Sequence, residues 1–192
     1  MVKILIILGN TKKKSFCREL ADSYERGAKS GGHLIKRINI GDLKFDPVLW
    51  EGDTHRDNLE PDLIKAQKSI LWAEHIVLFY PVWWMNMPAI VKGFMDRVFT
   101  SGFAYKFYEG KPFPERFLKG RSARLILTMD NNPFIYKIFF GNPGSKSIKK
   151  GVFLFCGICP TRVSKFGSVR KASDEKRKKW LAKVNRWGIK AK

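Results

Sequence analysis

The sequence predicts an α/β protein in which a parallel β-sheet is covered by helices on both faces. Two apolar runs, residues 2–8 and 76–80, show no alternation of apolar and polar residues, which is typical of strands buried on both faces. Segments with apolar residues at helical spacing alternate with such runs along the chain. This alternation implies a parallel sheet joined by right-handed crossovers.

Five strands and five helices are expected in one domain spanning residues 1–192, because the chain is long enough for one sizeable core and short for two. The expected strands are residues 2–8, 33–39, 76–80, 122–129 and 161–169. The expected helices are residues 15–29, 60–73, 88–98, 145–155 and 173–187. Residues 42–58 are expected to form a long connection, residues 100–120 a loop or irregular hairpin, and residues 134–140 an aromatic-rich excursion.

Local signals mark several of these boundaries. Pro81 ends the third strand because proline cannot donate to a β-ladder, and Pro88 suits the first turn of the following helix. Ser173, followed by Asp174 and Glu175, has the composition of an N-cap with an acidic first turn, and it starts the basic C-terminal helix.

A polar loop joins the first strand to the first helix. Such a loop presents unpaired backbone N–H groups and the positive end of the helix dipole at the carboxyl edge of the sheet. Asn10, Thr11 and Ser15 add side-chain donors, and lysines at positions 12–14 raise the positive potential. The loop is therefore a candidate anion site, although an ordinary connection with a capping serine looks similar. Neither GxxxxGK[ST] nor GxGxxG is present, so the Walker and Rossmann phosphate sites are not indicated.

The loop after the third strand, residues 81–87, is unusually apolar. It holds Val82, Trp83, Trp84, Met85 and Met87 where glycine, asparagine and serine are the usual residues. Large apolar side chains in a turn need a partner to cover them. Two partners fit: a planar aromatic ligand, or a neighbouring element or subunit.

The two loops are expected to lie side by side. In open parallel sheets, ligands bind outside the carboxyl ends of the strands at the switch point, which for the strand order 2-1-3-4-5 lies between the first and third strands. The polar loop and the aromatic loop follow those two strands. An anionic tail in the first and a flat ring against the second describe a flavin nucleotide.

The formal net charge of +20 is concentrated near the C-terminus. Residues 160–192 hold twelve Lys or Arg residues against two acidic residues, a balance of +10. Such a segment is either a solvated helix face or a surface for an anionic membrane, an acidic partner protein or nucleic acid. No helix-turn-helix, zinc-finger or RNP-type pattern accompanies it, which argues against nucleic acid.

Three cysteines, Cys17, Cys156 and Cys159, fit a reducing compartment better than a disulfide framework. The spacing of Cys156 and Cys159 is that of a redox or half-metal motif. No second ligand pair accompanies them, and His33, His55 and His75 are scattered singly, so we expect no metal site and two buried structural thiols. The chain shows neither an eighteen-residue apolar run nor a signal-peptide pattern, and we expect a cytoplasmic protein, with the membrane surface as a second location.

Two longer motifs add a resemblance to a known family. Pro81-Val82-Trp83-Trp84-Met85 is followed by Met87-Pro88-Ala89, Lys92-Gly93 and Asp96-Arg97-Val98, and then by Gly102-Phe103-Ala104-Tyr105. These motifs resemble the flavin-ring segment and the next signature of the flavodoxin-like NAD(P)H:quinone oxidoreductase family, which includes the bacterial modulator-of-drug-activity reductases and the ancillary flavoproteins of potassium-efflux systems. Ser15-Phe16 is similar to the phosphate-loop pair of that family, and the similarity extends loosely to about Gly167.

The resemblance implies a flavodoxin-like three-layer α/β/α sandwich with a five-stranded parallel sheet in the order 2-1-3-4-5, and a homodimer with its sites at the subunit interface. It implies that Tyr136 and Asn142 take catalytic roles and that Phe103 and Tyr105 belong to the substrate pocket. The loops and the resemblance together give the expected cofactor-binding residues: Asn10, Thr11, Ser15, Phe16, Pro81, Val82, Trp83, Trp84, Met85, Thr128, Met129, Asp130 and Asn131.

The sequence also departs from the family pattern. Many members have a Thr-Gly-Gly type turn after the fourth strand, whereas this chain has Met129-Asp130-Asn131-Asn132. Asparagine can adopt the left-handed conformation that such a turn needs, but Asp130 would lie unfavourably near an anionic reduced flavin. Asn142 stands where some relatives have a histidine, which removes a titratable group from the pocket.

The resemblance implies an NAD(P)H dehydrogenase (quinone)-like flavoprotein, holding FMN or FAD, that transfers two electrons to a quinone-like acceptor by a ping-pong hydride mechanism. The positive charge favours NADPH over NADH for its extra phosphate. The alternative is a regulatory flavoprotein that docks on a membrane transporter or an acidic partner, with reductase activity secondary.

Overall fold

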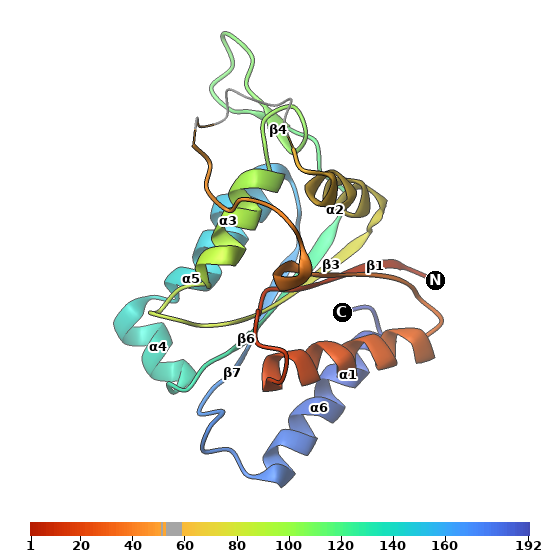
Figure 1. Ribbon diagram of the computed structural model, residues 1–192, viewed down its shortest axis with the longest axis vertical. Coiled ribbons are helices and arrows are strands. Elements are labelled where there is room, and N and C mark those ends of the chain that lie inside the picture. The colour runs from red at the N-terminus through yellow and green to blue at the C-terminus, as the bar shows by residue number, and fades with distance from the viewer. Residues whose placement is uncertain (51, 53–58) are drawn as a thin grey trace.

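Five parallel strands form the central sheet, in the order β2-β1-β3-β6-β7 (Figure 1). The computed structural model describes residues 1–50, 52 and 59–192. The strands are β1 (Lys3–Leu8), β2 (Leu34–Asn39), β3 (His75–Pro81), β6 (Ser122–Thr128) and β7 (Thr161–Phe166). The predicted order 2-1-3-4-5 is confirmed, because β4 (Tyr105–Lys106) and β5 (Glu115–Arg116) form a separate antiparallel hairpin and leave β6 and β7 as the fourth and fifth strands of the sheet.

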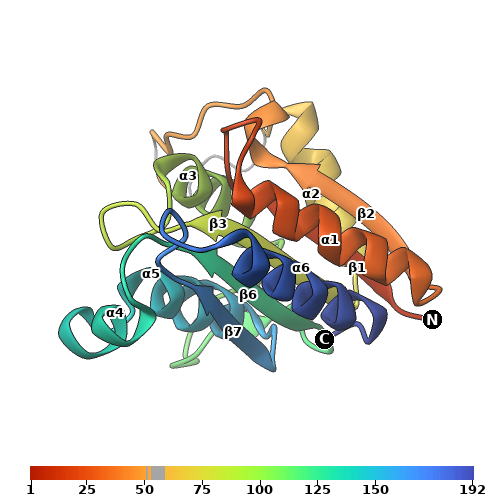
Figure 2. The ribbon, with the colours of Figure 1, turned by 90° about the horizontal axis from the view of Figure 1, so that it is seen from below.

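Helices cover both faces of the sheet, so that the molecule has three layers (Figure 2). Helices α1 (Phe16–Ser30) and α6 (Asp174–Ile189) lie side by side on one face. The other face carries α2 (Pro61–Trp72), α3 (Ala89–Val98) and the π-helical segment η3 (Ser147–Leu154), which continues from α5 (Pro143–Lys146). A short 3-10 turn, η1 (Ile40–Asp42), follows β2. None of the helices in the described part of the chain is long and apolar enough to cross a membrane.

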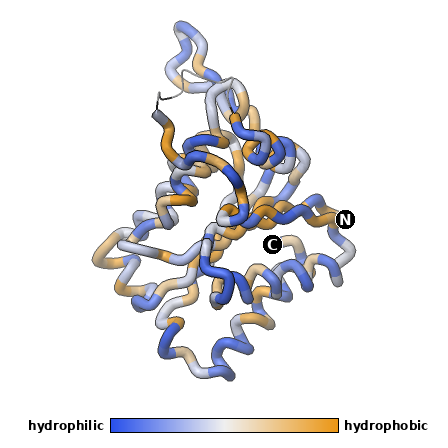
Figure 3. The backbone as a smooth tube through the Cα atoms, viewed as in Figure 1, coloured by the Kyte–Doolittle hydropathy of each residue, from blue (hydrophilic) through white to orange (hydrophobic). Residues whose placement is uncertain are grey.

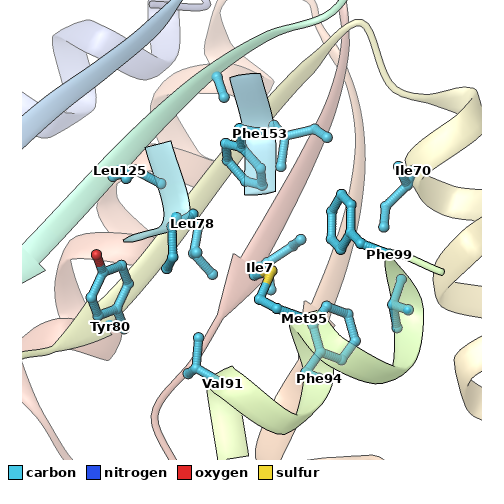
Figure 4. Close-up of a cluster of buried hydrophobic side chains, with 14 of the residues drawn as sticks. Ile7, Ile70, Leu78, Tyr80, Val91, Phe94, Met95, Phe99, Leu125 and Phe153 are labelled. Carbon is cyan, nitrogen blue, oxygen red and sulfur yellow. The ribbon is translucent and has the colours of Figure 1, made fainter. Parts of the chain in front are cut away.

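Two apolar clusters hold these layers together, one on each face. Because side chains alternate along a strand, Ile4, Ile6 and Leu8 of β1 face α1 and α6, whereas Leu5 and Ile7 face α2 and α3. All of these side chains are fully buried. Figure 4 shows the second cluster, in which side chains from α3 and η3 meet Ile7, Leu78 and Leu125 of the sheet.

Helix α6 is part of the folded core and not a free basic tail. Trp180 and Trp187 pack their rings against Phe166 of β7. Gly27 of α1 and Gly188 of α6 allow the two helices to approach closely, since a Cβ on either glycine would lie 2.1–2.2 Å from a backbone oxygen of the other helix. The lysines of its first turns are exposed, and this part of the chain is hydrophilic in Figure 3.

The structure corrects two predictions. The excursion expected at residues 134–140 is a helix, α4 (Pro133–Phe140), capped by Asn132 at its start and by left-handed Gly141 at its end. The prediction of two buried structural thiols is right for Cys156 and wrong for Cys159, which is exposed because it lies past the helical segment, next to Pro160. His55 and most of the second half of the expected long connection, residues 51 and 53–58, lie outside the described residues.

A buried histidine at the start of β3 should make the fold sensitive to acid. A hydrogen bond of 2.8 Å joins His75 Nδ1 to Ser122 Oγ. Burial, together with the positive charges of Arg124, Arg162 and His33, lowers the pKa of His75 from 6.5 to about 4. Between these values the unfolded chain binds a proton that the folded chain does not, so stability is lost as the pH falls through this window.

We therefore expect His75 to contribute a loss of about 2 kcal/mol in unfolding free energy between about pH 7 and about pH 5. His75→Asn keeps a polar partner for Ser122 but does not titrate. Urea unfolding of both proteins across this range is the measurement, and equal pH slopes for the two proteins would contradict the assignment.

Candidate functional site

A cavity of about 340 Å³ opens at the carboxyl ends of β1, β3, β6 and β7. Its lining residues come from the ends of β3 and β6, the loops at this edge of the sheet, the first turn of α1, and α6: Asn10, Lys12, Ser15, Phe16, Cys17, Pro81, Val82, Trp83, Thr128, Met129, Asp130, Val169, Arg170 and Arg177. A smaller cavity of about 120 Å³ adjoins it beyond Val82 and Met129, and is lined further by Trp84, Met85, Asn131 and Tyr136.

The end of the large cavity nearest α1 has the donors of an anion site. Ser15 is the N-cap of α1, and its Oγ accepts hydrogen bonds from Asn10 Nδ2 at 2.9 Å and from the Arg18 N–H at 3.3 Å. Asn10 is buried, and its Oδ1 accepts from the Lys12 N–H, so the loop is held in one conformation. The positive end of the α1 dipole adds to the charge of Lys12 here.

Arg177 of α6 brings a second cation to the same cavity. Its guanidinium lies 5.6 Å from the Phe16 ring and donates to the Val169 carbonyl oxygen. Its Nε is buried and has no hydrogen-bond partner within the described residues. Because Arg177 lines the cavity, its positive charge makes this end of the cavity suited to an anionic group.

The aromatic loop forms the opposite wall. Backbone hydrogen bonds of 2.9 Å in both directions join Trp83 and Asn86, closing a two-residue turn in which Trp84 and Met85 have positive φ values of 47° and 61°. Positive φ is costly for bulky residues, by about 1–3 kcal/mol each, and persists only where the surroundings enforce it. One effect of the turn is that the Trp84 side chain is 99% exposed, while Trp83 lines the cavity.

Between these two walls, the end of β6 and the loop after it form the bottom of the large cavity. Thr128 and Met129 are buried and line the cavity, and the Val82 N–H donates to the Thr128 carbonyl oxygen at 2.8 Å. Cys17 lies beneath, where burial raises the pKa of its thiol to about 12, so the thiol stays protonated.

The carboxylate of Asp130 is paired. Its oxygens accept from the Arg170 Nε at 2.9 Å and from the Arg170 N–H at 3.2 Å. Both side chains are largely exposed, so the pair is worth at most about 1 kcal/mol in stability. Arg170 nevertheless places a positive charge beside Asp130, whose negative charge was expected from the sequence to be unfavourable at this position.

Tyr136 links α4 to the aromatic turn. Its hydroxyl donates to the Met85 carbonyl oxygen at 2.8 Å and accepts from the Gly144 N–H at 3.1 Å, and burial raises its pKa. Asn142 does not line either cavity. It lies behind Tyr136 with φ of 59°, and its Oδ1 accepts a short hydrogen bond from Lys165 Nζ.

Three of the expected site residues lie elsewhere within the chain. Thr11 lines a separate hollow on the other side of Trp83. Phe103 and Tyr105 line neither cavity, and Tyr105 lines a hollow of about 240 Å³ between α3 and η3, where its ring packs against Phe155. The remaining cofactor-binding residues predicted from the sequence are brought together by the structure, together with Tyr136.

Five residues at or beside the site were missed from the sequence: Cys17, Lys165, Val169, Arg170 and Arg177. They lie in α1, in β7, in α6 and in the connection between β7 and α6. No local motif marks them, but the predicted topology places the loop after β7 at the same edge of the sheet, which is the signal that could have found Val169 and Arg170.

Comparison with known proteins shows what the chain resembles. A family model described as "flavodoxin-like fold" matches residues 2–187. An uncharacterized NAD(P)H oxidoreductase of Haemophilus influenzae is 30% identical over 93% of this chain and 89% of its own length. The human ribosyldihydronicotinamide dehydrogenase [quinone] is 30% identical over 94% of this chain and 87% of its own. A crystal structure from Streptococcus mutans has a TM-score of 0.83 at 32% identity, covering 98% of this chain and 99% of that one.

The Tyr136 hydroxyl is expected to hold the aromatic turn in place. Tyr136→Phe leaves the Met85 carbonyl and the Gly144 N–H without their partner, which should lower the unfolding free energy by about 1–3 kcal/mol. Urea unfolding of the purified protein measures this. Tyr108→Phe, which removes a hydroxyl from an exposed ring, is the matched control, and a Tyr136→Phe protein as stable as this control would contradict the role.

Proposed function

Because the chain belongs to the flavodoxin-like NAD(P)H:quinone oxidoreductase family, we propose that it is a flavin-dependent enzyme that transfers two electrons from NAD(P)H to a quinone-like acceptor. The observation that carries the proposal is the cavity at the ends of β1 and β3, which has anion donors at one end and an aromatic wall at the other. The name of the human relative supports a quinone as the acceptor.

The residues present fit a flavin nucleotide. Ser15, Asn10 and the first turn of α1 would hold its phosphate, and the positive charge of Arg177 would add to the attraction. The backbone of Trp83, Trp84 and Met85 would lie along one edge of the ring, and Met129 would support its face. A bound flavin would supply two-electron redox chemistry between NAD(P)H and a quinone, which gains two electrons and two protons in total.

The protein's own residues position the reactants. Tyr136 lines the smaller cavity and would contact the acceptor, whereas Asn142 and Lys165 act through it as positioning residues. Burial and the nearby Lys137 lower the pKa of Lys165. Since donor and acceptor would use the same ring face in turn, the proposed kinetics are ping-pong.

A homodimer is the second part of the proposal. Leu49, Met95, Phe155 and Tyr105 line an apolar hollow on the outer side of α3 that nothing within the described chain fills. Packing a second copy against this face would cover it, and would explain why Tyr105 lines neither cavity of its own chain. The three unpaired cysteines fit a reducing compartment, and we place the protein in the cytoplasm.

Flavin binding is the direct test. Purified protein should carry, or take up, FMN or FAD with its characteristic visible absorbance, and Ser15→Ala should weaken flavin binding at least about tenfold through the lost phosphate contact. Ser173 provides a matched control, because it caps α6 with the same hydrogen-bond length of 3.3 Å but lies outside both cavities. Both variants should lose about 1 kcal/mol of stability. A colourless protein that gains no flavin absorbance would overturn the proposal.

The Asp130–Arg170 pair gives a second test. Arg170→Gln leaves Asp130 unpaired, and its negative charge should then disfavour a reduced, anionic flavin and lower the midpoint potential of the bound cofactor. Adding Asp130→Asn to that variant should restore the potential. Potentiometric titration measures all three proteins, and a potential unchanged by Arg170→Gln would show that the pair does not act on the ring.

A further inference from the structure

Lys165 occupies a position of β7 at which the fold favours an apolar side chain. The register pairs it with Leu127 of β6, and both Leu127 and Val163 belong to the apolar cluster on the α3 side of the sheet. The next residue, Phe166, packs in the cluster on the other side. Because side chains alternate along a strand, Lys165 points to the same side as Val163, where it is partly buried.

The amine of Lys165 lies against the tyrosine of the small cavity. Its Nζ is 5.7 Å from the centre of the Tyr136 ring and donates a hydrogen bond to Asn142 Oδ1. Asn142 has a left-handed backbone, with φ of 59°, and its carbonyl oxygen accepts from the Lys146 N–H at 3.0 Å, so the group that orients the amine is itself fixed. Lys165 lines neither cavity, whereas Tyr136 is fully buried and lines the small one.

No carboxylate of the described residues neutralises this amine. Burial and the positive charge of Lys137 lower its pKa. Asp130, the acid that lines the small cavity, is paired with Arg170. The titratable side chains of the surrounding elements, β3, β6, α4, α5 and η3, include Tyr80, Arg124, Tyr136, Lys137, Lys146, Lys149 and Lys150, and α4, α5 and η3 contain no acid. The charge of Lys165 is therefore uncompensated within these elements, and it can act on a negative charge in the cavity.

We propose that Lys165 acts through Tyr136 to stabilise the negative charge that forms on the acceptor, so that its protonation state controls acceptor reduction. The inference rests on the proposed function. A quinone that takes up a hydride, which is two electrons and one proton, carries one negative charge until a second proton arrives from water. The charged amine stabilises this anion by Coulomb attraction, and the neutral amine does not. The arrangement lies within one chain, so a second copy packed over the cavities would leave it in place.

The pH dependence of quinone reduction tests this role. With flavin bound, the wild-type kcat should fall as the pH rises through the Lys165 pKa, because the amine loses its charge. Lys165→Met should lower kcat at neutral pH at least about tenfold, change the KM of the uncharged quinone less than about threefold, and show no such fall. Lys165→Arg keeps a charge that does not titrate, so it should retain the rate and also show no fall.

Lys137 offers a variant outside both cavities. It is exposed on α4, and its charge lowers the pKa of Lys165. Lys137→Met should therefore move the fall in kcat to higher pH and leave the rate at neutral pH unchanged. Lys149→Met is the matched control, because it removes an exposed lysine whose charge is not among those that lower this pKa, and it should move nothing.

NMR follows the amine without turnover. The ε-carbon signal of Lys165, identified by its absence in Lys165→Arg, should titrate below the ordinary lysine range, and Lys137→Met should move its midpoint upward. A midpoint that moves in Lys137→Met while the fall in kcat stays in place would contradict the inference. So would a Lys165→Met protein that reduces the quinone as fast as the wild type, or a Lys165→Arg protein as slow as Lys165→Met.

The inference and the proposed function fail in different ways. A wild-type protein that binds flavin and reduces quinone, with a pH dependence that Lys165→Arg leaves unchanged, would overturn the role of Lys165 and leave the proposed function standing. A protein that binds no flavin would overturn the proposed function and the inference with it.

Discussion

The site depends on one constraint, the parallel pairing of β1 with β3. The register pairs Leu8 with Phe79, and the Gly9 N–H still donates to the Phe79 carbonyl oxygen at 2.7 Å, so both strands release their loops at the same level. A Cβ at Gly9 would lie 2.4 Å from Val91 Cγ2, which shows how closely α3 packs here. Since the two loops leave adjacent strands on opposite sides of the sheet, a polar wall and an aromatic wall face each other across one cavity.

The conformation of the aromatic wall, residues 83–86, depends less on the strands than on a small network of hydrogen bonds. Trp84 and Met85 hold left-handed conformations that bulky residues avoid, and the Met85 carbonyl is pinned by Tyr136 from a helix that comes fifty residues later. The same hydroxyl accepts from Gly144, so the turn, α4 and α5 are coupled through one oxygen. Strain in the turn is tolerable because these bonds leave few other conformations open to it.

Features encoded in local sequence could be predicted, and features created by tertiary packing could not. The buried strands, the Ser15 cap and the aromatic loop each depend on a few consecutive residues, and they were enough to predict two walls of the site, whereas the strand order came from the family resemblance. Helix α4 was missed because it has only eight residues, too few for its helical period to be told from an irregular apolar stretch. Arg177 was read only as part of a basic run, because its place in the cavity follows from the packing of α6 on α1 and β7.

The exposed apolar side chains of α4 do not contribute to the core, and other groups hold the helix in place. Burying a phenylalanine or isoleucine side chain contributes about 1.5–3 kcal/mol, and α4 leaves five such side chains outside the core. A helix that needed this energy to fold would turn its apolar residues inward, whereas α4 is held by its caps and by Tyr136. Because the tyrosine that fixes the helix also lines the acceptor cavity, any contact made by α4 sets the direction from which the cavity is approached.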